Sequence, residues 1–143
     1  MRITTKGRYA VRAMINLCIN ENGSPISIKS IAQQEEISPE FLEQIFFKLK
    51  KSGIISSTRG PGGGFRLNKK MEEITIYELF DAVEEGLQFT PCTNCSTSEV
   101  CNKVSTCVSH ILWRKISTSL IKDLENTSLA DLMEEGKSAR LIS

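Results

Sequence analysis

ISPEFLEQIFFKLKKSGIISSTRGPGGGFRL, residues 37–67, contains a helix with both ends marked, followed directly by a glycine-rich hairpin. Ser38 is a typical N-cap, Pro39 occupies the first helical position, and Gly53 follows lysines in the last turn. One face repeats apolar side chains at i, i+3, i+4 and i+7: Leu42, Ile45, Phe46 and Leu49. This pattern predicts an amphipathic helix between Ser38 and Gly53 that buries one face and leaves the other free.

The free face carries side chains of the types that read DNA bases and phosphates. These are Glu40, Gln44, Phe47, Lys48 and Lys51, with Glu43 on the flank. Gln can form two hydrogen bonds with adenine, Glu can accept one from the cytosine amino group, and Lys can neutralise phosphates. An ordinary solvated helix face has a similar composition, so this helix alone leaves both interpretations open.

The residues after this helix predict a β-hairpin. Strands are expected at 54–58 and 65–68, joined by a turn at 60–64 with Arg59 and Arg66 on either side. Glycine lacks a Cβ, so such a turn brings backbone N–H groups close to a phosphate or into a narrow groove. A nucleotide-binding loop is the rival interpretation, but GPGGGF lacks the Lys-Ser/Thr pair of a P-loop and does not open a helix. The pattern indicates the wing of a winged helix-turn-helix domain.

Three more helices complete the predicted domain, residues 1–85. The first carries an apolar face at helical spacing: Ala10, Ala13, Met14, Leu17 and Cys18. NGSP at 22–25 ends it, Ser27 caps a short second helix, and TIYELFDAVEEG at 75–86 forms the last. A free thiol on an apolar face behaves as a small hydrophobic side chain, so we expect Cys18 in the core. The expected fold class is mostly α with a small β-wing.

Charge is divided unevenly along the chain. Residues 1–70 hold 12 Lys and Arg against 5 Asp and Glu, a balance of +7, whereas residues 71–143 hold 6 against 12, a balance of −6. A basic module suits a polyanionic partner such as double-stranded DNA, although a run of charge is also the usual composition of a solvated face. With 143 residues and 40% hydrophobic side chains, the chain can form one core and an appended element.

The sequence shows no segment of the kind that enters a membrane. No run of about 18 apolar residues occurs, and MRITTKGRYAVRAM at the start lacks the apolar stretch of a secretion signal. We therefore expect a cytoplasmic protein with no membrane partner. Thiols stay reduced in that compartment, so five cysteines in a short chain indicate metal or redox chemistry rather than structural disulfides.

A long helix is predicted over 103–125, within a dimerisation segment at 103–128. Its apolar positions step mostly by four: Val104, Val108, Ile111, Leu112, Trp113, Ile116, Leu120, Ile121 and Leu124. Steps of four overshoot a turn by about 40°, so the apolar arc drifts around the helix and exceeds what one neighbour can cover. We infer a homodimer in which this helix packs against its twin and against the other protomer's DNA-binding domain. The tail, 129–143, has little to bury and is expected to be partly disordered.

The segment 86–110 concentrates side chains that bind metals. Cys95, Cys101, Cys107 and the single histidine, His110, form the pattern C-x5-C-x5-C-x2-H. Cys107 and His110 lie on one helical face near a helix N-terminus, whose partial positive charge favours a thiolate. Zinc accepts three cysteines and one histidine, and an iron–sulfur cluster is held by the same ligand types. The spacing alone does not separate these two centres from a site without metal.

Three stretches together resemble the family of IscR-type iron–sulfur cluster regulators, which are winged-helix proteins: MRITTKGRYAVRAM, SPEFLEQIFFKLKKSG with STRGPGGGFRL, and the C-x5-C-x5-C-x2-H run with ILW behind it. The resemblance covers nearly the whole chain. It implies a homodimer joined through the long helix that represses genes for cluster assembly when it holds a 2Fe-2S cluster. The implied ligands of that cluster are Cys95, Cys101, Cys107 and His110.

The resemblance also assigns residues to DNA contact. Ser38, Glu43 and Gln44 of the helix and Arg59 of the wing match positions that touch DNA in that family. Glu43 matches the position that restricts which sites the cluster-free protein accepts. The full predicted set is Ser38, Pro39, Glu43, Gln44, Lys48, Arg59, Gly60, Gly62 and Gly63. Relatives that sense nitric oxide have an acidic ligand near the N-terminus where this chain has Arg8, so that branch is disfavoured.

Cys92 departs from the family pattern. It adds a thiol three residues before Cys95 and leaves the ligand set open between three cysteines with His110 and four cysteines. A cluster-free or zinc-binding regulator that responds to thiol redox state is the alternative function. A thiol oxidoreductase using Cys92 and Cys95 would need a preceding βαβ pattern, which is missing, and a zinc-stapled interaction module would need no DNA. The sequence therefore predicts a DNA-binding transcriptional repressor of cluster assembly genes, acting at palindromic sites, and no enzyme.

Overall fold

The computed structural model describes residues 2–93 and 101–143. Within them the chain is mostly helical with one two-stranded antiparallel sheet, which confirms the predicted fold class. The elements in chain order are α1 (Thr5–Ile19), α2 (Ile28–Glu35), α3 (Pro39–Lys51), β1 (Ile55–Thr58), β2 (Gly64–Leu67), the short 3-10 helix η1 (Met71–Glu73), α4 (Ile76–Ala82), the 3-10 helix η2 (Pro91–Thr93), α5 (Val108–Glu125) and α6 (Leu129–Ser138). None of the helices in this part of the chain is long and apolar enough to cross a membrane.

Side-chain caps fix where α2 and α3 begin. Ser27 and Ser38 each accept a hydrogen bond from a backbone N–H of the first turn, at 3.1 and 3.2 Å, so both predicted N-caps are confirmed. Pro39 is the first residue of α3, and Gly53 follows the helix with φ at 78°, a conformation that favours glycine. The boundaries of α3 are therefore those that its sequence predicts.

The core lies between α1, α3, α4, α6 and the base of the sheet. Its largest fully buried side chains are Phe46, Met14, Leu17, Ile31, Leu42, Ile45, Leu49, Ile54, Ile55, Ile74, Leu79 and Leu129. Cys18 belongs to this cluster and is 5% exposed, which confirms its predicted place in the core. Burial, with a smaller effect from the charge of Glu21, raises the pKa of the Cys18 thiol to about 12. This thiol is therefore protonated at neutral pH.

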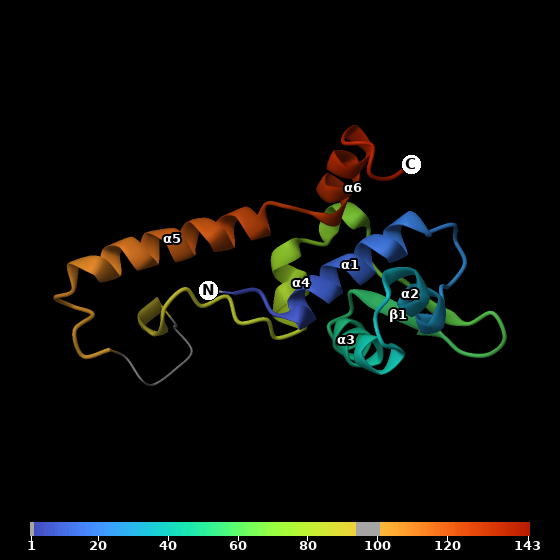
Figure 1. Cartoon of the computed structure of the whole chain (residues 1–143), viewed down its shortest axis with the longest axis horizontal. Helices are drawn as coiled ribbons and strands as arrows, with labels where there is room; N and C mark the ends of the chain where they lie inside the picture. Colours follow the sequence, from blue (N-terminus) through green and yellow to red (C-terminus); the bar gives the residue numbers. More distant parts are fainter. Residues whose placement is uncertain (1, 94–100) are drawn as a thin grey trace.

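The wing is attached to the domain at its base. β1 and β2 pair in the antiparallel register that places Ile55 opposite Leu67. Ile26, just before α2, extends this sheet by exchanging two backbone hydrogen bonds with Phe65, at 2.9 and 2.8 Å. The Phe65 ring meets Phe46 of α3 edge to face, with 5.0 Å between ring centroids. The turn between the strands extends away from the helices (Figure 1), and its base is held against α3.

α5 projects from the domain as one long helix (Figure 1). It begins at Val108 rather than at the predicted position 103, because residues 102–106 form turns, and it ends at Glu125. Several of its apolar side chains are between 36 and 81% exposed: Val108, Ile111, Leu112 and Ile116. Part of the predicted apolar arc is thus open to solvent in the single chain.

The C-terminal segment forms a helix over Leu129–Ser138, so the prediction of a partly disordered tail is wrong for this stretch. Ser128 and Asp131 form a capping box that begins α6. Leu129 and Met133 are 0 and 9% exposed and join the core beside α1 and η1. Two apolar positions four apart are a weak signal by themselves. Their partners lie far away in the sequence, and burial against those partners is what stabilises so short a helix.

Candidate nucleic-acid interface and cysteine site

The free face of α3 is exposed, as its periodicity predicts. The outward side chains are Glu40, Glu43, Gln44, Phe47 and Lys51, and Ser38 and Pro39 are exposed at the N-terminal end. The ring of Phe47 is 68% exposed. On the opposite side, Phe41 packs edge to face against Tyr9 of α1, with 5.8 Å between centroids. A supported helix with this polar and aromatic face has the dimensions and chemistry to enter a major groove.

Lys48 differs from the prediction that placed it on the free face. Its side chain is 32% exposed, and its ammonium forms an ion pair with Glu84, two residues after α4. A hydrogen bond from this ammonium, together with its charge, holds the pKa of the Glu84 carboxyl below its ordinary value. Glu84 could not be predicted as a partner, because 36 positions separate the two residues and no local pattern links them.

The wing turn presents one arginine and a set of glycines. Arg59, Gly60 and Gly62 are exposed, and both glycines adopt positive φ, at 96° and 74°. Gly63 is required by close packing, since a Cβ there would lie 2.8 Å from the carbonyl oxygen of Gly60. The turn therefore offers bare backbone beside a cationic side chain, a combination suited to a phosphate or a narrow groove.

A buried carboxylate fixes the chain where it leaves the winged domain. Glu85 is 6% exposed, and its two carboxylate oxygens accept hydrogen bonds from the Thr4 N–H and the Gly7 N–H, each at 2.9 Å. The Thr4 hydroxyl donates to the same carboxylate. Burial alone would raise the pKa of Glu85, but the hydrogen bonds from Thr4 and Gly7 outweigh it and lower the pKa below its ordinary value. Glu85 thus satisfies backbone donors at the start of α1.

The start of α5 presents a thiol and an imidazole with metal-binding chemistry. Cys107 is the N-cap of α5, and hydrogen bonds from the Ser109 hydroxyl, at 3.0 Å, and from the His110 N–H hold the pKa of its thiol below the ordinary value. The Nδ1 atom of His110 is buried and has no hydrogen-bond partner among residues 2–93 and 101–143. Buried polar atoms without a partner are uncommon, and imidazole nitrogens are common metal ligands.

Cys92 and Cys101 lie in the segments that precede this helix. Cys92 lies in η2, which packs against α5. Just before η2, Phe89 stacks on Trp113 of α5 with 5.8 Å between ring centroids. Cys101 is exposed, and Cys95 falls outside the described residues. Within the part of the chain that the structure describes, no three Cys, His, Asp or Glu side chains meet as a metal site. The donor types, thiols and an imidazole nitrogen that has no partner within these residues, nevertheless suit an iron or zinc centre.

Comparison with known proteins identifies the family. Residues 3–135 match the Rrf2 family, described as iron-dependent transcriptional regulators. The chain belongs to the Rrf2 family. IscR of Aliivibrio salmonicida is 38% identical to this Rrf2 protein over 96% of the chain and 80% of its own length. IscR of Escherichia coli O1:K1 is 39% identical over 93% of the chain and 80% of its own length.

Solved structures similar to this Rrf2 protein have the same fold. T. potens IscR matches with a TM-score of 0.79 at 28% identity, covering 100% of this chain and 93% of that one. CymR, the global cysteine regulator of B. subtilis, matches with a TM-score of 0.77 at 30% identity, covering 94% and 98%. The resemblance to IscR-type regulators is confirmed. The family and these relatives are transcriptional regulators rather than enzymes, so this Rrf2 protein is a DNA-binding regulator.

Proposed function

We propose that this Rrf2 protein is a cytoplasmic homodimer that represses genes for iron–sulfur cluster assembly. Its recognition of palindromic DNA sites would depend on a 2Fe-2S cluster held by Cys95, Cys101, Cys107 and His110. Gln44 and Glu43 would read base edges in the major groove, and Arg59 with the wing glycines would contact the backbone or the adjacent minor groove. Ser38 and Pro39 would contact DNA at the start of α3, and Lys48 would contact a phosphate.

The observation that carries the cluster proposal is the buried Nδ1 of His110, which has no hydrogen-bond partner within the described part of the chain. Cys107 would supply a thiolate at the N-terminus of α5, where the helix dipole and the Ser109 hydroxyl favour the anionic form. One imidazole in place of a thiolate makes a bound 2Fe-2S cluster less negatively charged and easier to lose, so its occupancy would report the balance of cluster supply and demand.

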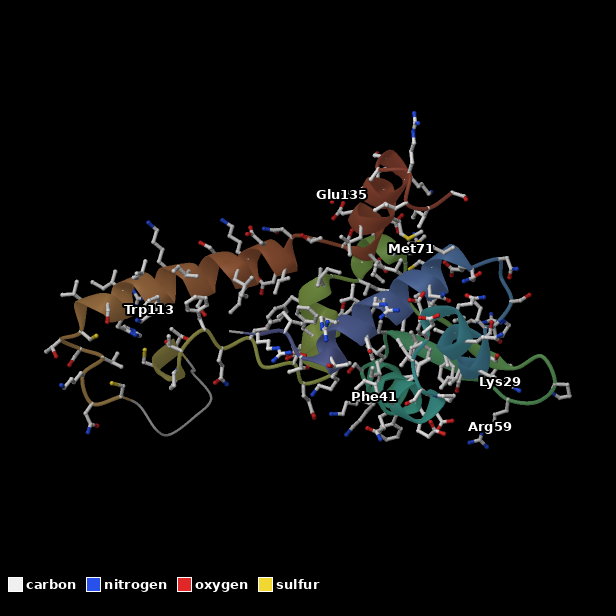
Figure 2. All side chains as sticks on the ribbon, in the orientation of Figure 1. Lys29, Phe41, Arg59, Met71, Trp113 and Glu135 are labelled. Atoms are coloured by element: carbon white, nitrogen blue, oxygen red, sulfur yellow. The ribbon has the colours of Figure 1, made fainter. Side chains whose placement is uncertain are left out.

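The cysteine segment and the wing are far apart in one chain. Trp113 on α5 and Arg59 at the wing lie at opposite ends of the molecule (Figure 2). An effect of the cysteine segment on DNA recognition therefore has to pass through the chain junction beside α1 or through a second protomer. A homodimer provides the second route.

Exposed apolar surface supports the homodimer. The side chains on α5 that would meet the partner helix are Val108, Ile111, Leu112 and Ile116, up to 81% exposed. A second apolar surface, a groove of about 550 Å³, lies where α1 and α4 meet the end of α5 and the start of α6. Ile3, Val11, Phe80, Leu124 and Leu132 are among the residues that line it. Contiguous apolar patches of this kind mark interaction sites, and the partner's α5 is the occupant we propose.

The dimer is tested by matched polar substitutions. Ile111→Ser removes an apolar side chain that is 63% exposed on α5, whereas Leu141→Ser removes one that is 80% exposed elsewhere. Sedimentation equilibrium should show weaker association for Ile111→Ser by at least tenfold, because burial of a large aliphatic side chain contributes about 1.5–3 kcal/mol per protomer. Leu141→Ser should associate like wild type. Equal behaviour of the two variants would contradict an interface on this face of α5.

DNA recognition is tested with a duplex selected by the protein from a random-sequence pool. Binding measured over a salt series should weaken with a log-log slope of about −0.9 for each phosphate contact. Gln44→Ala should weaken the free energy of binding to the selected duplex by about 1–3 kcal/mol and should change binding to a mixed-sequence duplex little. Arg59→Ala should weaken binding to both duplexes. A slope near zero for wild type would remove α3 and the wing as the DNA interface.

The cluster is tested on protein purified without oxygen. Wild type should show visible absorption, with iron and sulfide in stoichiometric amounts, and His110→Ala should lose or alter that spectrum. Cys18→Ala is the matched control, since this thiol is buried in the core. Cys92→Ser decides whether the additional thiol takes part. Stoichiometric zinc without iron or sulfide would replace the proposal with the zinc-binding alternative.

A further inference from the structure

The ion pair between Lys48 and Glu84 joins the proposed recognition helix to the end of α4. The ammonium of Lys48 reaches the carboxylate of Glu84, whose side chain is 74% exposed while that of Lys48 is 32% exposed. Both line a shallow pocket together with Lys51 and Phe47 of α3 and with Asp81 of α4. Two acidic side chains therefore lie beside the cationic edge of the surface that would face DNA, and Glu84 is the one that pairs with a lysine of α3.

We infer that Glu84 sets the DNA affinity of this protein by holding Lys48 in the free state. Lys48 can contact a phosphate only by leaving this carboxylate, so DNA binding exchanges one anionic partner of Lys48 for another. Glu84 is therefore a positioning residue that acts through Lys48. The inference rests on the proposed function of α3 as the recognition helix.

The backbone around Glu84 is held in place, so the pair breaks when Lys48 moves toward DNA. The next residue, Glu85, binds the N–H groups of Thr4 and Gly7 with its buried carboxylate. Lys6 donates a hydrogen bond to the Glu84 carbonyl oxygen at 3.2 Å. Glu84 itself adopts φ of 57°, a left-handed conformation uncommon for a residue other than glycine. A carboxylate on so fixed a backbone cannot follow the ammonium into a groove.

A carboxylate at this position weakens DNA binding in two ways. It pairs with the Lys48 ammonium, which is then not available to neutralise a phosphate and release a counterion from the DNA. Its own exposed negative charge also repels the phosphate backbone. The hydrogen bond and charge of Lys48 lower the pKa of the Glu84 carboxyl below its ordinary value, so this group is ionised at neutral pH. Exposed ion pairs contribute little to folding stability, so removal of the charge should change DNA affinity more than stability.

The experiment compares Glu84→Gln with Asp81→Asn on a fluorescent mixed-sequence DNA duplex. Asp81 is an exposed acid on α4, three residues before Glu84, and lines the same pocket, but no ion pair involves it among the described residues. Asp81→Asn therefore measures the general effect of removing one negative charge. Glu84→Gln should bind about three- to tenfold more tightly than wild type, and its log-log salt slope should be steeper by about 0.9. Asp81→Asn should change the affinity less and leave the slope unaltered.

Each substitution is repeated in a Lys48→Ala background. In that background Glu84→Gln should raise DNA affinity no more than Asp81→Asn does, because the additional gain from Glu84→Gln depends on releasing Lys48, which is absent. Equal effects of the two substitutions with Lys48 present, or a loss of affinity in Glu84→Gln, would overturn the inference. Wild-type protein that binds no duplex at all would instead refute the proposed function. Thermal unfolding of every variant checks that the fold is intact.

Discussion

Gly7 lies against the carboxylate of Glu85, and this contact makes an unusual prediction about an alanine substitution. A Cβ on Gly7 would come within 2.9 Å of Glu85 Cδ and closer still to the Oε2 atom. The carboxylate is the flexible end of a side chain, but here it is 6% exposed and held by the N–H groups of Thr4 and Gly7. Gly7→Ala must therefore displace it and weaken at least one of these charge-assisted hydrogen bonds.

Gly7→Ala is expected to change the free energy of unfolding in opposite directions in the wild-type protein and in a Glu85→Ala variant. Alanine in place of glycine in a helix stabilises by up to about 1 kcal/mol, whereas loss of a hydrogen bond to a charged group costs about 1.5–3 kcal/mol. Gly7→Ala should therefore destabilise the wild-type protein by about 1–2 kcal/mol. In a Glu85→Ala background the carboxylate is gone, and Gly7→Ala should stabilise by about 0.5–1 kcal/mol. The coupling free energy between the two positions is then about 1.5–3 kcal/mol.

Urea unfolding of the four proteins, followed by circular dichroism at one fixed protomer concentration, measures this cycle. The fixed concentration matters because association of the chain adds to its apparent stability. Gly7→Ala that stabilises the wild-type protein would refute the placement of the Glu85 carboxylate against α1. If Gly7→Ala still destabilised the protein in the Glu85→Ala background, the destabilisation would have to come from a contact other than the one with the Glu85 carboxylate.

Three other perturbations follow from the same structure. Glu85 has a lowered pKa in the fold, so its contribution to stability is present above about pH 4.5 and is lost as the pH falls through the folded-state value; urea unfolding over a pH series should show this loss in wild type and not in Glu85→Gln. Gly64→Ala should destabilise the protein by about 1–3 kcal/mol and weaken DNA binding, because a Cβ would overlap the Ile26 carbonyl at the base of the wing. In cluster-free protein at pH 8, peptide mapping after iodoacetamide treatment should find Cys101 modified and Cys18 protected until denaturant is added, since Cys18 is buried with a pKa of about 12.

The parts of the fold that the sequence predicts are those with local signals. Ser38, Pro39 and Gly53 mark α3, because capping and backbone preference act within a few residues of the position they specify. The glycine-rich turn of the wing is predictable for the same reason, since positive φ at Gly60 and Gly62 is a property of single residues. The exposed face of α3, and with it most of the candidate DNA interface, follows directly from the helical period.

The parts that could not be predicted depend on partners far away in the sequence. The capping box at Ser128 is local, yet α6 is stable only because Leu129 and Met133 meet a core built from residues at the other end of the chain. The same holds for the candidate site, because the ion pair of Lys48 with Glu84 joins α3 to the residues just after α4, which no periodicity relates. Thiol spacing placed metal-binding side chains near the start of α5, but the burial of the His110 Nδ1 atom, which has no partner among the described residues, depends on how that helix is covered.

The fold brings acidic side chains from the second half of the chain next to lysines of the basic first half. The first 70 residues carry a balance of +7 and the remainder −6, which suggests a basic reader beside an independent acidic part. In the structure, acids of α4 and the residues just after it turn back onto the basic module: Glu78 pairs with Lys69, and Glu84 pairs with Lys48. Two of the lysines that make the first half basic are therefore partly neutralised before DNA arrives. The acids of α4 and of the residues just after it therefore lower the electrostatic attraction of the basic module for DNA, so neutralising them should raise DNA affinity although α4 enters no groove.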